Sequence, residues 1–395
     1  MTPSARLSAA ISLLDEILQG APAERCLTRW ARQNRYAGSK DRAAVRDVVF
    51  DCLRQKRSFA HLSGDATGRG LVLAHQFSAG VALIDMFTGE GFAPAALTQT
   101  ETTRLGIGED ASLPVAYDFP DFLLPELMRS LGDDLPAVMA AMQQRAPVDL
   151  RVNCLKASIR EAEQMLARDL IFTARHPLAE NALRILENPR KLARSLAYSY
   201  GLVELQDVSS QAISAFCGAK PGMVVLDYCA GGGGKTLALA ADMGGQGDLI
   251  AHDANPNRMK DLPERARRGA AMVEVLNTAQ LAQKSPICDL VVVDAPCTGT
   301  GAWRRNPDAK WRISQGFIDE ITALQAQILH DAAKFVALGG VLAYATCSIL
   351  RTENADQIAR FLHETPGWKL LDDVSYTPLD GGDGFYGARL EKLKN

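Results

Sequence analysis

One stretch decides the fold, and it reads Asp227-Tyr-Cys-Ala-Gly-Gly-Gly-Gly-Lys-Thr236. A short apolar run, Met223–Leu226, precedes it and is expected to be a buried strand, whereas a helical pattern follows over Lys235–Asp242. Consecutive glycines let the backbone turn tightly and approach a ligand closely. The N-terminus of the helix adds amide groups that have no helical partner. The stretch therefore predicts a strand, a cofactor-binding loop and a helix.

The residues of this loop exclude two common nucleotide-binding motifs. A phosphate-binding P-loop needs glycine where this chain has Cys229, and the last glycine of a G-x-G-x-x-G motif would fall on Thr236 or Leu237. S-adenosylmethionine instead needs a close backbone approach and an acidic residue for the ribose at the end of the next strand, a position that Asp253 has. The alternative is a flexible turn with an ordinary capping aspartate. The candidate cofactor-binding residues are Asp253 and the loop residues Cys229, Ala230, Gly231, Gly232, Gly233, Gly234 and Lys235.

Strands and helices alternate from this loop to the C-terminus. Further buried strands are expected at Asp248–His252, Met272–Leu276, Leu290–Val293 and Gly340–Ala345, with helices between them such as Phe317–Ala337. This rhythm predicts an α/β domain with a mostly parallel sheet and helices on both faces. In such sheets the ligand crevice lies beyond the carboxyl ends of the strands.

Two smaller regions precede this sheet. Helices are expected over Ala5–Leu18, Arg25–Asn34, Asp41–Leu53 with Ser39 as its N-cap, and Val72–Phe87. The stretch Leu105–Pro125 is rich in Gly, Pro and Asp and is expected to link two bodies. A strand at Val148–Leu155, a helix at Ser158–Arg168 and short strands up to Leu205 then predict a small α+β unit. The expected domains are residues 1–118, 119–210 and 211–395.

Composition narrows the class of protein. The chain has 395 residues and a net charge of −3, which argues against a protein that coats nucleic acid by charge alone. The local basic segment Arg25–Arg57 is either an RNA-binding face or a solvated helical face. No apolar run approaches the roughly 20 residues of a membrane helix, and the charged N-terminal residues do not resemble a signal peptide, so we expect a cytoplasmic protein. The 8 cysteines include no C-x-x-C pair, so neither a metal site nor a disulfide framework is expected.

Two cysteines stand at the ends of predicted strands. The strand that ends at Asp294 continues as Asp294-Ala-Pro-Cys297, and the strand Gly340–Thr346 delivers Cys347. Both thiols should therefore face the crevice of the glycine loop. The remaining cysteines outside that loop are expected to be inert core residues, and they are Cys26, Cys52, Cys154, Cys217 and Cys288.

Several motifs together match a known family. The segments Cys229–Thr236, Asp294-Ala-Pro-Cys297, Thr346-Cys-Ser348 with Glu353-Asn354, and Asp383-Gly-Phe-Tyr386 resemble the Sun/RsmB family of bacterial ribosomal RNA 5-methylcytosine methyltransferases, and Arg151-Val-Asn153 and Gln206–Ser210 resemble its segments upstream of the catalytic domain. The resemblance implies a Rossmann-like class I methyltransferase sheet, S-adenosylmethionine as cofactor, and RNA, specifically small-subunit ribosomal RNA, as partner of a monomer that binds no membrane. The N-terminal helices, with Lys40-Asp-Arg42 and Leu53-Arg54, look like the NusB-like RNA-binding domain of the bacterial branch.

The resemblance also implies a role for each site residue. Cys347 would be the nucleophile that adds to C6 of cytosine, and Asp294, which also borders the cofactor, would hydrogen-bond the N3/N4 edge of the base. Lys235 is expected to reach the same pocket, and Cys297 would assist removal of the C5 proton or release of the covalent adduct. A target base in paired RNA would have to be flipped out. DNA cytosine methyltransferases use a cysteine that corresponds to Cys297 as nucleophile, so the reverse assignment stays open.

Two positions depart from the family's pattern. The family's loop reads Cys-Ala-Ala-Pro-Gly-Gly-Lys-Thr, whereas this chain has Gly231 and Gly232 in place of Ala and Pro, so a more mobile loop is expected. The aspartate that the family often places near the adenine is best matched by Asn277.

Other functions and one further loop complete the expectations. A tRNA substrate and a non-catalytic RNA-binding role in ribosome assembly are the alternatives; an exocyclic-amine methyltransferase would need an Asn/Asp-Pro-Pro-Tyr-type motif in place of Asp294-Ala-Pro-Cys297. The basic stretch Arg304–Arg312, near Trp303 and Trp311, is either an RNA-contacting loop or a surface loop anchored by buried tryptophan.

Overall fold

The computed structural model describes residues 1–106 and 110–394. The chain forms two compact units. Unit 1 comprises Met1–Arg145 together with Trp303–Ile313, and unit 2 comprises Ala146–Ala302 and the chain from Ser314 onward. Within the described residues, no helix is both long enough and apolar enough to cross a membrane.

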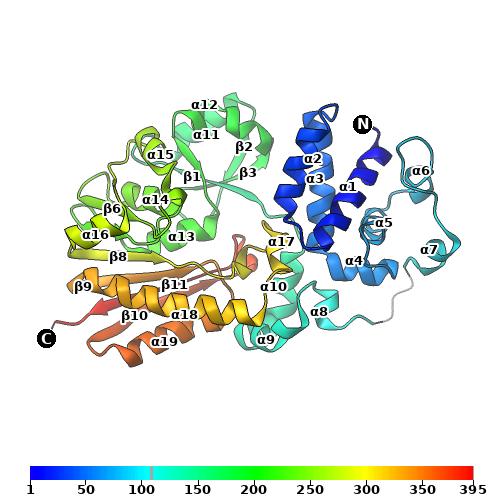
Figure 1. Cartoon of the computed structure of the whole chain (residues 1–395). Coiled ribbons are helices and arrows are strands. Elements are labelled where there is room, and N and C mark those ends of the chain that lie inside the picture. The colour runs from blue at the N-terminus through cyan, green and yellow to red at the C-terminus, as the bar shows by residue number, and fades with distance from the viewer. Residues whose placement is uncertain (107–109, 395) are drawn as a thin grey trace. The chain divides into compact units, whose positions relative to one another are not determined.

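Unit 1 is built from helices (Figure 1). Its longer helices are α1 (Pro3–Leu18), α2 (Ala23–Gln33), α3 (Ser39–Arg54), α4 (Lys56–Ser63), α5 (Gly68–Ser78), α9 (Leu124–Leu131) and α10 (Leu135–Met142), and the short ones are α6 (Leu83–Met86), α7 (Gln99–Arg104), α8 (Leu113–Ala116) and α17 (Pro307–Lys310). Apolar residues at helical spacing, such as Leu7 and Leu14 of α1, pack against Val49 and Leu53 of α3 in one core.

Three expectations about this unit need comment. The prediction of one helix over Val72–Phe87 is wrong: α5 ends at Ser78, because Gly80 has a φ of 69° and its N–H bonds to the Phe77 carbonyl. The N-cap of α3 is Gly38 rather than Ser39, and the Asp41 carboxylate accepts the Gly38 N–H at 3.1 Å. The expected link over 105–125 contains α8, and its residues 107–109 lie outside the described residues.

The segment Trp303–Ile313 belongs to unit 1, although the residues on both sides of it belong to unit 2. Its helix α17 packs on α3. Lys310 donates a hydrogen bond to the Arg54 carbonyl at 2.9 Å, and the Trp311 indole N–H donates to the Leu53 carbonyl at 2.7 Å, so the segment satisfies carbonyls at the end of α3. Trp303 is only 1% exposed. Of the two interpretations, the loop anchored by buried tryptophan is confirmed, and Trp303 has no exposed face on which a base could stack.

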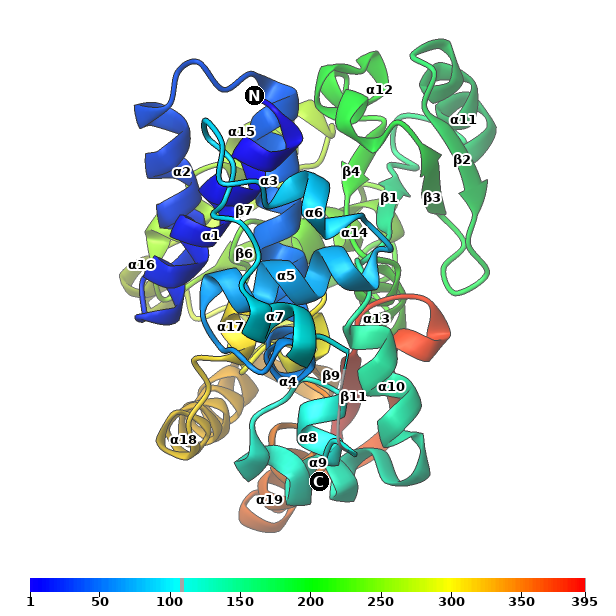
Figure 2. The same cartoon turned by 90° about the vertical axis from the view of Figure 1, so that its right-hand side faces the viewer.

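Unit 2 begins with a small antiparallel sheet (Figure 2). Its strands are β1 (Val148–Val152), β2 (Phe172–Arg175), β3 (Ala182–Glu187) and β4 (Val203–Leu205), in the order β2-β3-β1-β4. The helices α11 (Ile159–Arg168) and α12 (Leu196–Ser199) complete this α+β part. Leu150 and Leu183 of the sheet pack against Leu166 of α11. The predicted small α+β unit is confirmed.

The larger sheet of unit 2 has seven strands in the order β10-β11-β9-β8-β5-β6-β7. The strands are β5 (Val224–Asp227), β6 (Asp248–His252), β7 (Glu274–Leu276), β8 (Cys288–Asp294), β9 (Val336–Thr346), β10 (Trp368–Tyr376) and β11 (Phe385–Lys392). The five from β5 to β9 pair in parallel, whereas β10 and β11 are antiparallel. The predicted mostly parallel sheet is confirmed.

Helices cover both faces of this sheet (Figure 1). The helices are α13 (Val208–Cys217), α14 (Gly234–Asp242), α15 (Leu262–Arg268), α16 (Thr278–Lys284), α18 (Gln315–Ala332) and α19 (Ala355–Glu364). Alternation along the strands explains the two layers, because Leu226 packs with residues of α16, α18 and α19, whereas its neighbour Val225 packs with residues of α13 and α14. The helix expected over Phe317–Ala337 ends earlier, at Ala332, and β9 already begins at Val336.

Candidate active site

The site lies where three parallel strands end side by side. β5 leads into the glycine loop, its neighbour β8 ends at Asp294, and β9, next to β8, ends at Thr346. Beyond the strands the backbone pairing continues, since the Ala295 N–H donates to the Ala345 carbonyl and the Gly301 N–H donates to the Cys347 carbonyl, each at 2.9 Å. The loop after β8 and the loop after β9 are therefore joined to each other.

This pairing brings the two strand-end cysteines together. Their Sγ atoms lie 3.3 Å apart, within hydrogen-bonding distance for sulfur, and both residues are half-buried. The hydrogen bond to Cys347 raises the pKa of Cys297 well above its ordinary value, and burial and the negative charge of a Cys347 thiolate add to the effect. The raised pKa favours a neutral thiol at Cys297, and either sulfur can be the donor in this contact.

An ion pair between a buried lysine and a half-buried aspartate stands at the same edge of the sheet. The Lys235 ammonium lies 2.9 Å from Oδ1 of Asp294, and the Lys235 side chain is 7% exposed against 34% for Asp294. Burial alone would lower the pKa of Lys235, but the charge of Asp294 and its hydrogen bond outweigh burial, so the pKa is raised. The Lys235 ammonium also lies 5.0 Å from the centre of the Phe385 ring. Lys235 therefore stays charged and holds the Asp294 carboxylate at the strand end.

The glycine loop and Asp253 form the second half of the site. The Asp253 carboxylate is 3% exposed, accepts the Gly231 N–H at 2.9 Å and forms an ion pair with Arg258 at 3.1 Å. Gly231 and Gly233 both have a positive φ, at 52° and 81°, so this turn requires glycine there. A Cβ at Gly233 would lie 2.2 Å from Leu262. The loop is thus folded against the acidic residue that the sequence assigned to it.

One carboxyl of the site was not expected to have a role. Asp227, at the end of β5, is completely buried; its Oδ2 accepts the Thr236 hydroxyl at 2.6 Å, while its Oδ1 has no hydrogen-bond partner among the described residues. Burial, with a smaller contribution from the charge of Asp294, raises the pKa of Asp227 to about 7. The signal in the sequence was an acidic residue at the end of the strand that precedes the glycine loop. Its carboxyl lies at the end of β5, where the glycine loop begins.

Comparison with known proteins places the chain in a family. Residues 217–389 match the family described as 16S rRNA methyltransferase RsmB/F, and residues 119–192 match its ferredoxin-like domain. The ribosomal RNA small subunit methyltransferase B of Erwinia tasmaniensis is 35% identical over 292 residues, which cover 70% of this chain and 67% of that protein. The same enzyme of Vibrio cholerae is 32% identical over 315 residues, which cover 76% of this chain and 72% of that protein. The chain belongs to the RsmB/F methyltransferase family.

Solved structures share the fold at lower identity. A structure of the protein PH0851 superposes with a TM-score of 0.76 at 24% identity and covers 99% of both chains. NSun6 from Pyrococcus horikoshii, solved with SFG, superposes with a TM-score of 0.63 at 19% identity over 70% of this chain and 99% of that chain. The predicted fold, with a helical region, a small α+β unit and a methyltransferase sheet, is confirmed.

The structure also shows where the remaining predicted residues of this RsmB/F chain lie. Asn277 is exposed and caps α16, where its side chain accepts the Gln280 N–H at 3.0 Å. Cys229 is half-buried, and the buried Ala230 donates its N–H to the His252 carbonyl at 2.8 Å. Cys154, which was expected in the core, is exposed. Among the described residues, no group of three or more His, Cys, Asp or Glu side chains has an arrangement that could hold a metal ion.

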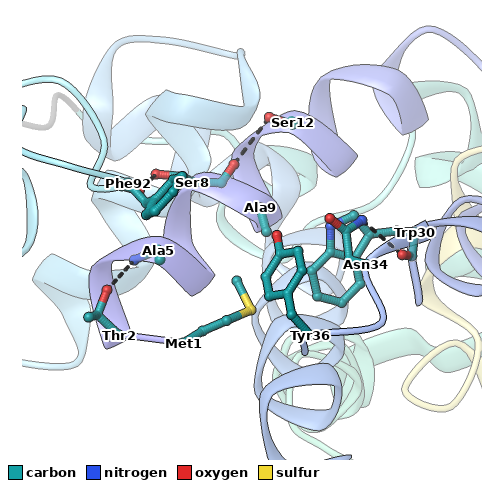
Figure 3. A pocket seen from close by; sticks show the side chains of 10 residues that line it. All are labelled: Met1, Thr2, Ala5, Ser8, Ala9, Ser12, Trp30, Asn34, Tyr36 and Phe92. Carbon is teal, nitrogen blue, oxygen red and sulfur yellow. Dashed lines mark hydrogen bonds between the residues drawn. The ribbon is translucent and has the colours of Figure 1, made fainter. Parts of the chain in front are cut away.

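A groove on unit 1 contains none of these residues (Figure 3). It has a volume of about 740 Å³. Its aromatic lining residues are Trp30, Tyr36 and Phe92, and the Tyr36 and Phe92 side chains are 73% and 86% exposed. Two of its lining residues are bonded to each other, since the Ser8 hydroxyl donates to the Phe92 carbonyl at 2.7 Å.

Proposed function

We propose that the protein transfers a methyl group from S-adenosylmethionine to C5 of a cytosine in 16S ribosomal RNA, through a covalent bond between Cys347 and C6 of the base. The observation that carries this proposal is the pair of thiols 3.3 Å apart at two adjacent strand ends. The Lys235–Asp294 ion pair stands at the ends of the same strands. Curated relatives named as small-subunit ribosomal RNA methyltransferases support ribosomal RNA, rather than tRNA, as the substrate.

The residues of the glycine loop fit a nucleoside cofactor without phosphates. Backbone turns at Gly231 and Gly233 leave no Cβ on the loop, the buried Asp253 carboxylate is available to two ribose hydroxyls once Arg258 moves, and the Oδ1 atom of Asp227 has no partner among the described residues. S-adenosylmethionine supplies an electrophilic methyl group when it is bound. Asn277, at the end of β7, remains the candidate for the adenine.

The raised pKa of Cys297 supports Cys347 as the nucleophile. C5 of cytosine is a poor nucleophile, and addition of a thiolate to C6 makes the ring electron-rich at C5. The pKa of Cys297 is raised by its hydrogen bond to Cys347 and by burial, so Cys297 is disfavoured as the attacking thiolate. In the reverse assignment Cys297 would have to lose its proton first, against its hydrogen bond to Cys347 and against burial.

The causes of the raised pKa of Cys297 also suggest at which step this residue acts. Attack on C6 converts the Cys347 sulfur into a neutral thioether, which removes the largest cause of the raised pKa of Cys297. Cys297 can then lose its proton to solvent and accept the C5 proton after methyl transfer. Elimination of the Cys347 sulfur from C6 restores the aromatic ring. During attack, Asp294 accepts a hydrogen bond from the N4 amino group, and Lys235 holds that carboxylate in place.

The proposal assigns a function to each of the expected domains. Residues 211–395 perform methyl transfer, residues 119–210 form the α+β part, and the helical residues 1–118 bind RNA. The family match that begins at residue 119 supports the limit between residues 118 and 119. By compactness, unit 1 continues to Arg145.

The experiment that tests the proposal combines a genetic and a biochemical assay. Bisulfite sequencing of total RNA from a deletion strain should show one 16S cytosine that loses methylation, and plasmid-borne enzyme should restore it. The Cys347→Ala variant should not restore it, whereas Cys297→Ala should leave an RNA–protein adduct that survives a denaturing gel. Cys154→Ala is the matched control and should behave as wild type, because this exposed cysteine lies outside the site. An active Cys347→Ala enzyme with a dead Cys297→Ala enzyme would establish the reverse assignment.

A further inference from the structure

A buried carboxylate, Glu353, lies between the two cysteine loops. The residue is 0% exposed and follows β9 in a short 3-10 turn, Arg351–Glu353. Its Oε2 atom accepts the backbone N–H of Thr298 at 2.9 Å, and its Oε1 atom accepts the Thr298 hydroxyl. Thr298 is the residue directly after Cys297. One end of the contact is therefore fixed to the loop that carries the first thiol.

The same carboxylate holds the other cysteine loop. The Ser348 hydroxyl donates to Oε1 of Glu353, and Ser348 is the residue directly after Cys347. The next residue, Asn354, completes the contact: its Oδ1 accepts the Thr346 hydroxyl at 2.6 Å, and its side-chain amide donates to the Ser348 carbonyl at 2.9 Å. Both neighbours of Cys347 are thus bonded to the pair Glu353-Asn354.

A third element adds to this arrangement from a helix. The side-chain amide of Gln325, on α18, donates to the Pro296 carbonyl at 3.0 Å and to Oε2 of Glu353 at 2.9 Å. Gln325 is itself 0% exposed. Cys297 therefore has a bonded residue on each side, with Pro296 held by Gln325 and Thr298 held by Glu353.

We propose that Glu353 is the positioning residue of the thiol pair, because its carboxylate ties the loop of Cys297 to the loop of Cys347 and so sets the distance between the two sulfurs. Glu353 touches no reacting atom; it acts through Thr298 and Ser348. The inference rests on the proposed roles of the two cysteines. A carboxylate suits the task because it is acceptor-only and has room for four donors, and an uncompensated charge at this depth would be costly without them.

The first test measures the thiol distance without any RNA. Diamide takes two protons and two electrons from a pair of thiols and leaves a disulfide, so its rate of forming the Cys297–Cys347 bond reports how the sulfurs are held. Peptide mapping of the oxidised protein quantifies that bond. Glu353→Ala should slow it at least tenfold relative to wild type. Glu353→Gln should recover most of the rate, because a glutamine oxygen can still accept from Thr298 and Gln325 while the hydroxyls of Thr298 and Ser348 turn to accept from its amide.

The second test measures methyl transfer on the same variants. Misplacing a reacting group by about 1 Å can cost about 100-fold in rate, so Glu353→Ala should lower kcat about 100-fold and leave KM for RNA and for S-adenosylmethionine unchanged. Glu353→Gln should lower kcat less, by about tenfold. Ser348→Ala removes one link while both cysteines remain, and should also lower kcat with an unchanged KM.

The control is another buried carboxylate of unit 2. Asp149 is 2% exposed and forms an ion pair with Arg184 in the small sheet. Asp149→Asn should lower the melting temperature but leave both the disulfide rate and kcat as in wild type. If Glu353→Ala does not fold, Glu353→Gln and Ser348→Ala decide the question.

Two outcomes separate the possible failures. Melting temperatures that fall in the Glu353 variants, with an unchanged disulfide rate and an unchanged kcat, would overturn the positioning role and leave a purely structural one. Absence of methyl transfer by the wild-type enzyme would count against the proposed RNA reaction alone, because the disulfide rate would still report on Glu353.

Discussion

The Sγ atoms of Cys297 and Cys347 lie 3.3 Å apart, although 50 residues separate the two cysteines in sequence. The contact raises the pKa of Cys297, mainly through the hydrogen bond and then through burial. Only the thiolate is alkylated. The structure therefore predicts that Cys347 controls the reactivity of Cys297.

The first prediction concerns alkylation of Cys297. In Cys347→Ala the hydrogen bond and the partner's charge are gone, so the pKa of Cys297 should fall toward its ordinary value and its alkylation by iodoacetamide at pH 8 should become faster, by about tenfold for each unit of pKa recovered. Mass spectrometry of the Cys297 peptide over a time course measures the rate. The exposed Cys154 provides the internal reference in both proteins. Equal or slower alkylation in the variant would contradict the coupling.

The second prediction concerns a close backbone contact of Gly301, in the loop that follows Cys297. Gly301 and Gly384 are hydrogen-bonded, and a Cβ at Gly301 would lie 2.0 Å from the Gly384 carbonyl oxygen. Gly301→Ala must therefore displace the loop of Cys297, and we expect a loss of about 1–3 kcal/mol of stability and a fall in kcat of about 100-fold. Gly316→Ala is the matched control, because a Cβ there would meet no atom within 4 Å. A Gly301→Ala enzyme with wild-type kcat would show that the loop tolerates the shift.

How much of this site the sequence could predict depends on how local each signal is. Apolar strands ending at Asp294 and Thr346 placed both cysteines at one edge, because parallel neighbours end together. The role of Glu353 was not predictable, since its donors Thr298 and Gln325 come from distant segments. The end of α5 was readable in hindsight, because Gly80 completes a glycine C-cap that helical periodicity alone overlooks.

Unit membership shows the same limit. Trp303–Ile313 follows the Cys297 loop directly, so sequence order placed it with the strands of the larger sheet. Its bonds to Leu53 and Arg54 instead make it part of the helical unit. Contacts between residues some 250 positions apart produce no periodic pattern in a sequence. The sequence therefore left two interpretations of this basic, tryptophan-containing segment open.

The third prediction concerns cofactor affinity and pH. Asp227 has a pKa of about 7 because it is buried, and its Oδ1 atom lacks a partner among the described residues. A positively charged cofactor should favour the ionised carboxylate, so Kd for S-adenosylmethionine should fall as the pH rises from 6 to 8. Asp227→Asn should bind about tenfold more weakly at pH 8, a loss comparable to one charge-assisted hydrogen bond, and should show no such pH dependence. Calorimetric titration across this range measures both, and a pH-dependent Kd in the variant would assign the effect to another group.

The fourth prediction concerns Lys310, whose ammonium is buried in unit 1. Burial lowers its pKa from an ordinary 10.5 to about 7, although the charge of Asp118 opposes this shift. Between these two values the unfolded chain binds one more proton than the folded chain, so the free energy of unfolding should rise with pH in this window, and it should be flat below 7 and above 10.5 for this group. The full effect is on the order of 5 kcal/mol, because the pKa falls from 10.5 to about 7 and each unit is worth about 1.4 kcal/mol.

Lys310→Met isolates this contribution from every other group that titrates in the same window. The variant loses the hydrogen bond to the Arg54 carbonyl, which is a constant cost at every pH. The variant also lacks the buried charge. In wild type this charge destabilises the folded state fully near pH 6.5 and no longer does so above pH 10.5, where Lys310 is neutral in both states. Wild type should therefore gain several degrees in melting temperature relative to Lys310→Met as the pH rises from 6.5 to 9.5. A difference between the two proteins that stays constant over this range would mean that Lys310 keeps an ordinary pKa, and that the ammonium is solvated in solution.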